Sequence, residues 1–105
     1  MTNLTEILAD LRRQFSQILG NQFVGIYLYG SQARGDAQTD SDIDVLTVVQ
    51  GKFDYPELLS ITSEIVAQLS LENDVVISRA FVSQERFERE QSPFLLNIRR
   101  EAVAI

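Results

Sequence analysis

Two aspartates, Asp42 and Asp44, stand on either side of Ile43 at the start of an apolar segment. Side chains at positions i and i+2 of a strand point to the same face, about 6.5 to 7 Å apart. The two carboxylates would therefore repel each other unless a cation lay beside them. Mg²⁺ prefers oxygen ligands and keeps waters and substrate phosphates in its shell. The pair predicts phosphoryl or nucleotidyl transfer, for which two Mg²⁺ ions are the typical arrangement.

A glycine and a serine, Gly30 and Ser31, end the preceding apolar segment. A glycine turn lets the backbone approach phosphates closely, and a short helix beginning at Ser31 would direct its first amides toward them. Arg34 would lie within reach of the same pocket as a fixed positive charge. We therefore predict that Gly30, Ser31 and Arg34 bind the nucleotide, although Arg34 could instead form a surface salt bridge.

A third carboxylate would complete this site, and Asp74 is the candidate. We expect Asp74 to open the third strand as Asp42 opens the second, so that their side chains meet at one edge if the two strands are neighbours. Glu72 is a nearby competitor for this role. Two plainer roles stay open, in which Asp74 is a turn residue and Asp42 and Asp44 are solvent-facing loop carboxylates.

The spacing of apolar residues predicts alternating helices and strands. The expected helices cover residues 4–19, with Asn3 or Thr2 as the cap, residues 55–73, and a last helix from Pro93; Ser83 caps a short charged turn through Glu90. The expected strands cover residues 23–29, 42–49, 74–82 and, at the end, 102–105. This order predicts a single α/β domain, residues 1–105, with a mixed central sheet of three to four strands flanked by helices.

Composition excludes several kinds of chemistry. The chain of 105 residues has no cysteine and no histidine, so thiolate nucleophiles, Cys/His zinc sites and imidazole bases are absent. Its net charge of -6 disfavours extended contact with nucleic acid, whereas a small nucleotide could still bind through cations. The apolar runs are too short to span a bilayer. We expect a cytoplasmic protein without membrane contact.

The stretch GSQARGDAQTDSDIDVL, in which ten residues separate Gly30-Ser31 from Asp42-Ile43-Asp44, resembles the signature of polymerase-beta-type nucleotidyltransferases. With the short chain, it is similar to the minimal nucleotidyltransferases of bacteria and archaea, the MntA-type antitoxins that are paired with HEPN-domain RNase toxins. Residues 93–101 are like the closing helix of that family. Ala102 stands where many members have glycine.

The resemblance implies that AMP is transferred from Mg²⁺-bound ATP to a hydroxyl. By position, Asp42 and Asp44 would hold the metal ions, and Asp74 would contact the catalytic metal and help to deprotonate the acceptor. Gly30 and Ser31 would hold the triphosphate. In the antitoxin members the acceptor is a tyrosine of the toxin, so the expected partner is a cognate HEPN-type toxin in a hetero-oligomer.

Two other functions remain open. The chain could be a non-catalytic antitoxin that neutralises its partner by occlusion, which would suit its small size and its lack of an acceptor-binding domain. A small-molecule transferase of the antibiotic-modifying kind would need an acceptor pocket built by an oligomer.

Overall fold

The computed structural model describes residues 3–35 and 42–105, and the predicted order of elements is confirmed there. The α-helices are α1 (Leu4–Leu19), α2 (Ser31–Arg34), α3 (Tyr55–Asn73), α4 (Gln84–Arg89) and α5 (Pro93–Glu101). A 3-10 turn, η1 (Gly20–Gln22), follows α1. The strands are β1 (Phe23–Tyr29), β2 (Ile43–Val49), β3 (Ile77–Ser83) and β4 (Val103–Ala104).

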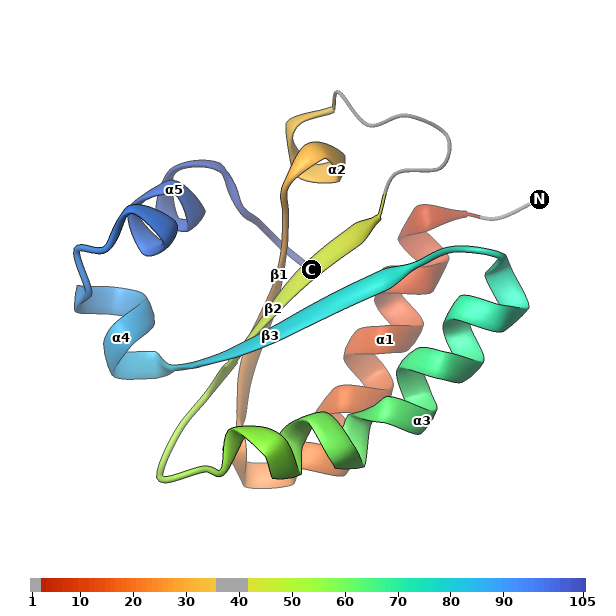
Figure 1. The fold of residues 1–105 in the computed structure, drawn as a ribbon, viewed down its shortest axis with the longest axis horizontal. Helices are drawn as coiled ribbons and strands as arrows, with labels where there is room; N and C mark the ends of the chain where they lie inside the picture. Colours follow the sequence, from red (N-terminus) through yellow and green to blue (C-terminus); the bar gives the residue numbers. More distant parts are fainter. Residues whose placement is uncertain (1–2, 36–41) are drawn as a thin grey trace.

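The strands form one mixed sheet in the order β3-β2-β1-β4. Strand β1 is antiparallel to both β2 and β4, whereas β2 and β3 are parallel neighbours. The parallel pair is joined through α3, the crossover that parallel strands require. This arrangement confirms the predicted α/β class. The second and third strands lie side by side, which was the condition for their first residues to meet at one edge (Figure 1).

Helices cover both faces of the sheet (Figure 1). On one face, α1 and α3 enclose the larger core, whose most buried members include Leu11, Phe15, Ile26, Ile43 and Val45. On the other face, α4 and α5 enclose a smaller core of Leu46, Val48, Val82, Leu95 and Ile98. Because side chains alternate along a strand, Asp44 lies on the face of Leu46, the face of α4 and α5.

The helix starts follow from local capping. The Asn3 side chain accepts hydrogen bonds from the amides of Thr5 and Glu6 at 2.9 and 3.3 Å, so Asn3 caps α1. Asp54 caps α3 in the same way, and Pro56 occupies the first turn, where its missing N–H costs nothing. These caps position α1 and α3 on the sheet that carries the aspartates.

The prediction that Asp74 opens the third strand is wrong. Helix α3 continues to Asn73, and Asp74 is its left-handed C-cap with φ of 51° and an amide that donates to Ser70. The chain needs this turn to leave the helix, so β3 begins three residues later, at Ile77.

No helix in the described part of the chain is long and apolar enough to cross a membrane.

Candidate active site

The site lies where β1 ends and β2 begins. Asp44 is paired across the sheet with Tyr29 of β1 on one side and with Ser78 of β3 on the other. Directly paired residues in neighbouring strands point to the same face, so these three side chains form a row at one level of the sheet. Ser78 was not identified from the sequence, because only the register of β2 against β3 brings it beside Asp44.

Gly30 directs the chain past Asp44 at very close range. Its φ of +76° is a conformation that residues with a side chain rarely adopt. A Cβ atom at this position would lie 2.5 Å from Oδ2 of Asp44, well inside van der Waals contact. Both the backbone turn and the space therefore require glycine, and the Asp44 carboxylate faces the backbone where the predicted phosphate loop begins.

The short helix predicted from Ser31 is present as α2. The amide of Arg34 donates to the Gly30 carbonyl at 3.1 Å, and the left-handed Gly35 ends the helix by donating to Ser31. Gly30 and Ser31 therefore stand at the start of α2, beside Asp44. Their contact with phosphate stays a prediction. The following residues 36–41 lie outside the described residues.

The two aspartates influence each other electrostatically. Asp42 is exposed and immediately precedes β2, whose first amide, that of Ile43, donates to the Val76 carbonyl at 2.8 Å. Partial burial, and then the negative charge of Asp42, raise the pKa of the Asp44 carboxyl, while Arg34 opposes the shift. The structure thus brings together the predicted pair and the predicted cation, and a bound cation would relieve the repulsion between the carboxylates.

Arg34 also links the site to the last helix. Its Nη1 lies 3.6 Å from Oε1 of Glu101 at the end of α5, and both side chains are partly exposed. Arg34 thus forms the surface salt bridge that was its alternative role. Its guanidinium is also close enough to Asp44 to influence that carboxyl.

Tyr29 and Phe94 border the site on the side of α5. The two rings meet edge to face with centroids 5.7 Å apart. Burial, followed by the charge of Asp44, raises the pKa of the Tyr29 hydroxyl, so Tyr29 stays protonated at neutral pH. Tyr29 therefore packs between the sheet and α5.

Asp74 is not a member of the row formed by Tyr29, Asp44 and Ser78, because it precedes the paired part of β3. It is exposed, and it ends α3 before the turn that leads to β3. No group of three or more acidic side chains placed to hold a metal ion occurs within residues 3–35 and 42–105. The assignment of Asp74 as third carboxylate and catalytic base therefore stays a prediction.

Comparison with known proteins shows the family of the chain. The family model for "Polymerase beta, Nucleotidyltransferase" matches residues 13–91. The chain belongs to this nucleotidyltransferase family. In Methanocaldococcus jannaschii, the relative named "Putative protein adenylyltransferase MJ0141" is 35% identical over 75 residues, which are 71% of this chain and 75% of the relative.

Solved structures share the nucleotidyltransferase fold. A crystal structure of a toxin-antitoxin with AMP-PNP has a TM-score of 0.61 at 14% identity, covering 97% of this chain and 72% of the other. A mutant of the toxin-antitoxin MntA-HpeT has a TM-score of 0.60 at 16% identity, covering 98% and 72%. The expected likeness to minimal nucleotidyltransferases is confirmed.

The residues present fit the divalent metal ion that nucleotidyltransferases usually use. Asp42 and Asp44 offer carboxylate oxygens, the donors that Mg²⁺ prefers, and their partial exposure leaves room for waters and phosphates. One or two carboxylates with substrate phosphates are an ordinary protein site for Mg²⁺. The number of ions, predicted as two, remains a prediction.

Proposed function

We propose that this nucleotidyltransferase transfers AMP from ATP to a hydroxyl of a protein partner, a tyrosine of a cognate HEPN-type RNase toxin, and thereby acts as an antitoxin. The observation that carries the proposal is the approach of Gly30 to Asp44. Gly30 has a positive φ and no side chain, which leaves room for the Asp44 carboxylate beside the loop expected to bind phosphate. A second carboxylate, that of Asp42, follows this loop in the sequence.

The proposed reaction exchanges a phosphoanhydride bond of ATP for a phosphodiester bond between AMP and the acceptor hydroxyl. The acceptor oxygen forms a bond to the α-phosphorus, the bond from that phosphorus to the bridging oxygen breaks, and pyrophosphate leaves. Mg²⁺ bound by Asp42 and Asp44 would neutralise charge that develops on the phosphates. Gly30 and Ser31 position the triphosphate, and Arg34 adds a fixed positive charge. We keep Asp74 as the proposed base that accepts the hydroxyl proton.

The identity of the acceptor is inferred from likeness to known proteins. The curated relative is named as a protein adenylyltransferase, and the two structures compared above are described as toxin-antitoxin. These likenesses support a protein acceptor and a toxin partner.

The test is label transfer to the protein encoded beside this chain. The purified pair is incubated with ATP labelled on the α-phosphate and with Mg²⁺, and the site of label is mapped by mass spectrometry. We expect label on a tyrosine of the partner, and none when Asp42 and Asp44 are both replaced by asparagine. Absence of transfer from the native chain, with both proteins folded, would refute the proposal.

A second candidate is a non-catalytic antitoxin that works by occlusion. It is favoured by one observation, namely that the described residues hold no group of three acidic side chains placed to bind a metal ion. The two candidates differ in cells that express the toxin. If D42N/D44N still binds the toxin and still protects the cells, occlusion is sufficient; if it binds and fails to protect, transfer is required.

A further inference from the structure

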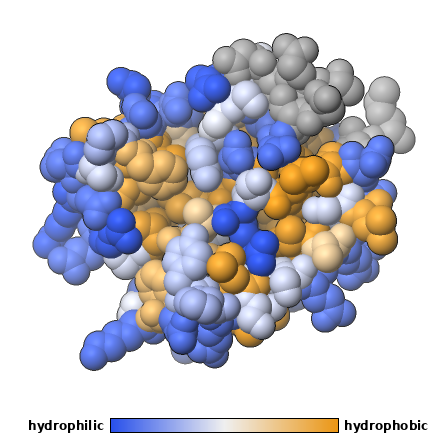
Figure 2. All heavy atoms as spheres, viewed as in Figure 1, coloured by the Kyte–Doolittle hydropathy of each residue, from blue (hydrophilic) through white to orange (hydrophobic). Residues whose placement is uncertain are grey.

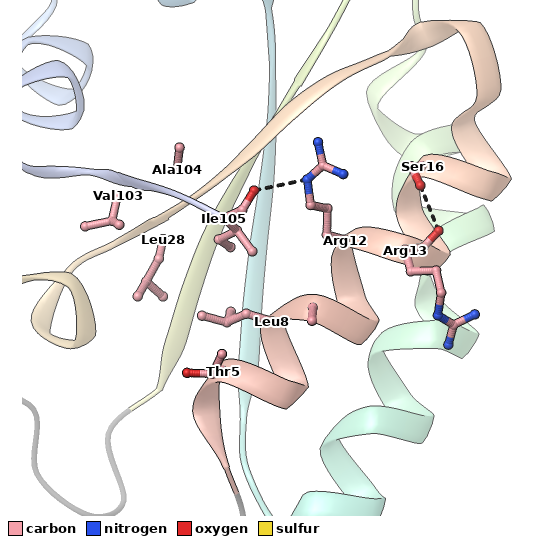
Figure 3. A pocket seen from close by; sticks show the side chains of 10 residues that line it. Thr5, Leu8, Arg12, Arg13, Ser16, Leu28, Val103, Ala104 and Ile105 are labelled. Atoms are coloured by element: carbon pink, nitrogen blue, oxygen red, sulfur yellow. Dashed lines mark hydrogen bonds between the residues drawn. The ribbon is translucent and has the colours of Figure 1, made fainter.

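A hollow lies on the face of the sheet opposite Asp44, between α1 and the short edge strand β4. It has a volume of about 560 Å³. Its apolar walls come from Leu8 of α1, Leu28 of β1 and Ile105 after β4. Figure 3 shows these three side chains gathered between the helix and the end of the chain. The hollow is therefore separate from the site of the two aspartates.

The strand that borders the hollow has an unpaired edge. The Ile105 amide donates to the Ile26 carbonyl at 3.0 Å, and Tyr27 pairs with Ala104. Hydrogen-bonded and non-hydrogen-bonded pairs alternate along antiparallel strands, so the N–H and C=O of Ala104 point away from β1. The sheet order places no strand beyond β4 among the described residues. Ala104 thus presents one donor and one acceptor to an incoming strand.

The polar lining of the hollow is basic. Arg12 and Arg13 both contribute, and the lining contains no aspartate or glutamate among the described residues, although the whole chain has a net charge of -6. Arg13 forms an ion pair with Asp10 along the helix. Arg12 instead donates from Nε to the Ile105 carbonyl at 3.0 Å, which holds its guanidinium at the rim of the hollow (Figure 3).

We infer that this hollow, which we name the β4 groove, docks an extended segment of the toxin partner that carries apolar residues and a carboxylate. The segment pairs with the outer edge of Ala104 and extends the sheet by one strand. It places apolar side chains on Leu8 and Leu28 and its carboxylate on Arg12. Backbone pairing supplies affinity and the pockets for alternate side chains supply specificity, as in other cases of strand addition. The inference rests on the proposed function for the identity of the partner.

Two independent substitutions test this docking. Ala104→Pro removes the amide that points away from β1. It removes no N–H that bonds to β1, because Val103 and Ile105 face that strand and Ala104 does not. Arg12→Glu reverses the charge at the rim. We expect each to weaken binding of the protein encoded beside this chain at least tenfold by titration calorimetry. Arg89→Glu, an exposed reversal at the end of α4, should leave affinity unchanged.

Hydrogen exchange on the native complex separates docking from misfolding. Protection should appear at residues 103–105 and in the first turns of α1 when the partner is added, while the variants alone keep native exchange in β1 and β2.

If both variants bind the partner with native affinity, the β4 groove is not the docking surface, and the proposed transfer is untouched. If the native chain transfers no label and binds no partner, the proposed function itself fails. If the substitutions instead abolish self-association of the chain alone, the occupant is a second copy and the inference is overturned.

Discussion

At the scale of single residues, the surroundings of Asp44 disfavour the ionised form of its carboxyl. Burial and the neighbouring Asp42 raise its pKa, so the folded chain binds the proton of this carboxyl more tightly than the unfolded chain does. Its contribution to stability is then greatest in acid and is lost as the pH rises through the unfolded and folded pKa values. Without metal, ionised Asp44 costs stability at neutral pH, as charges gathered for binding often do.

Asp44→Asn should therefore stabilise the metal-free chain while abolishing transfer. We expect a higher urea midpoint at pH 7. The difference should vanish once the pH falls below the ordinary pKa of aspartate, where the native and the unfolded carboxyl both carry a proton. Label transfer should fall by roughly 100-fold or more, the loss typical of removing one group that stabilises the transition state. Glu64→Gln, at an exposed position of α3, is the control and should change neither quantity. A destabilised Asp44→Asn at pH 7 would contradict this account.

The pair of Arg34 and Glu101 gives a prediction about nucleotide affinity. The two charges are 3.6 Å apart and partly exposed, so their interaction is worth less than about 1 kcal/mol. If Arg34 binds phosphate, Glu101 competes for it. Glu101→Gln should then lower the KM for ATP up to about fivefold, which corresponds to about 1 kcal/mol. Arg34→Ala should raise the KM, and in that background Glu101→Gln should have no further effect on it.

At the scale of elements, the turn between β1 and α2 brings the backbone against a carboxylate. Gly30→Ala should lose transfer by about 100-fold or more, because its Cβ would displace the Asp44 carboxylate. Gly51→Ala is the matched control, since Gly51 has φ of +78° and a Cβ added there would meet no atom within 4 Å. Both variants should lose about 1 to 3 kcal/mol of stability from backbone strain. Equal activity in the two variants would show that the close approach is not needed.

A polar link connects β3 to α3. Arg79 of β3 donates from Nε to the Thr62 hydroxyl at 2.9 Å and from Nη2 to the Leu59 carbonyl at 2.7 Å. Thr62 is fully buried, so removing its hydroxyl leaves a charged donor without one partner. Thr62→Val should cost about 1 to 3 kcal/mol in urea unfolding, whereas Thr62→Ser, which keeps the hydroxyl, should cost less. Equal losses would mean that packing of the methyl group, and not the link, matters.

The sequence predicted these elements well where periodicity and caps agree, and poorly where the outcome depends on tertiary contacts. Helix α1 and strand β1 lie within their predicted residues because apolar spacing, Asn3 and Gly20 mark their ends. The start of β3 was misplaced because an aspartate at position 74 is equally typical of the end of a helix and of the opening of a strand. Its left-handed φ of 51° is decided by how α3 packs and turns toward the sheet.

The site itself was predictable only along one loop. The spacing of Gly30-Ser31 and Asp42-Ile43-Asp44 located the turn and the paired carboxylates, because those residues are close in sequence. The row of Tyr29, Asp44 and Ser78 depends on strand register, which a single sequence does not encode locally. The ion pair of Arg34 with the last helix likewise joins residues that are far apart in the chain.

At the scale of the whole molecule, a small acidic domain leaves apolar surface uncovered. Figure 2 shows hydrophobic atoms on one face in two regions, near α4 and α5 and near the connection from α3 to β3, with hydrophilic atoms between them. Leu71 and Val76, at that connection, are 85% and 58% exposed. Apolar side chains so exposed favour association with a partner, in agreement with the hetero-oligomer that the proposed function requires.

The fold and the site should also be coupled through ligand binding. If the site assembles as proposed, Mg²⁺ and ATP bind only the folded chain, and a ligand concentration about 100 times Kd adds about 2.7 kcal/mol to its stability. For a domain of this size that is a rise in Tm of roughly 10 to 20 °C at pH 7. The rise should shrink in acid, because protons compete for Asp44, whose pKa is already raised.

Differential scanning calorimetry with Mg²⁺ and ATP, with ATP and EDTA, and with the D42N/D44N variant separates metal-dependent binding from a general salt effect. A native chain whose Tm does not move under saturating Mg²⁺ and ATP would show that Gly30, Asp42 and Asp44 do not form a nucleotide site.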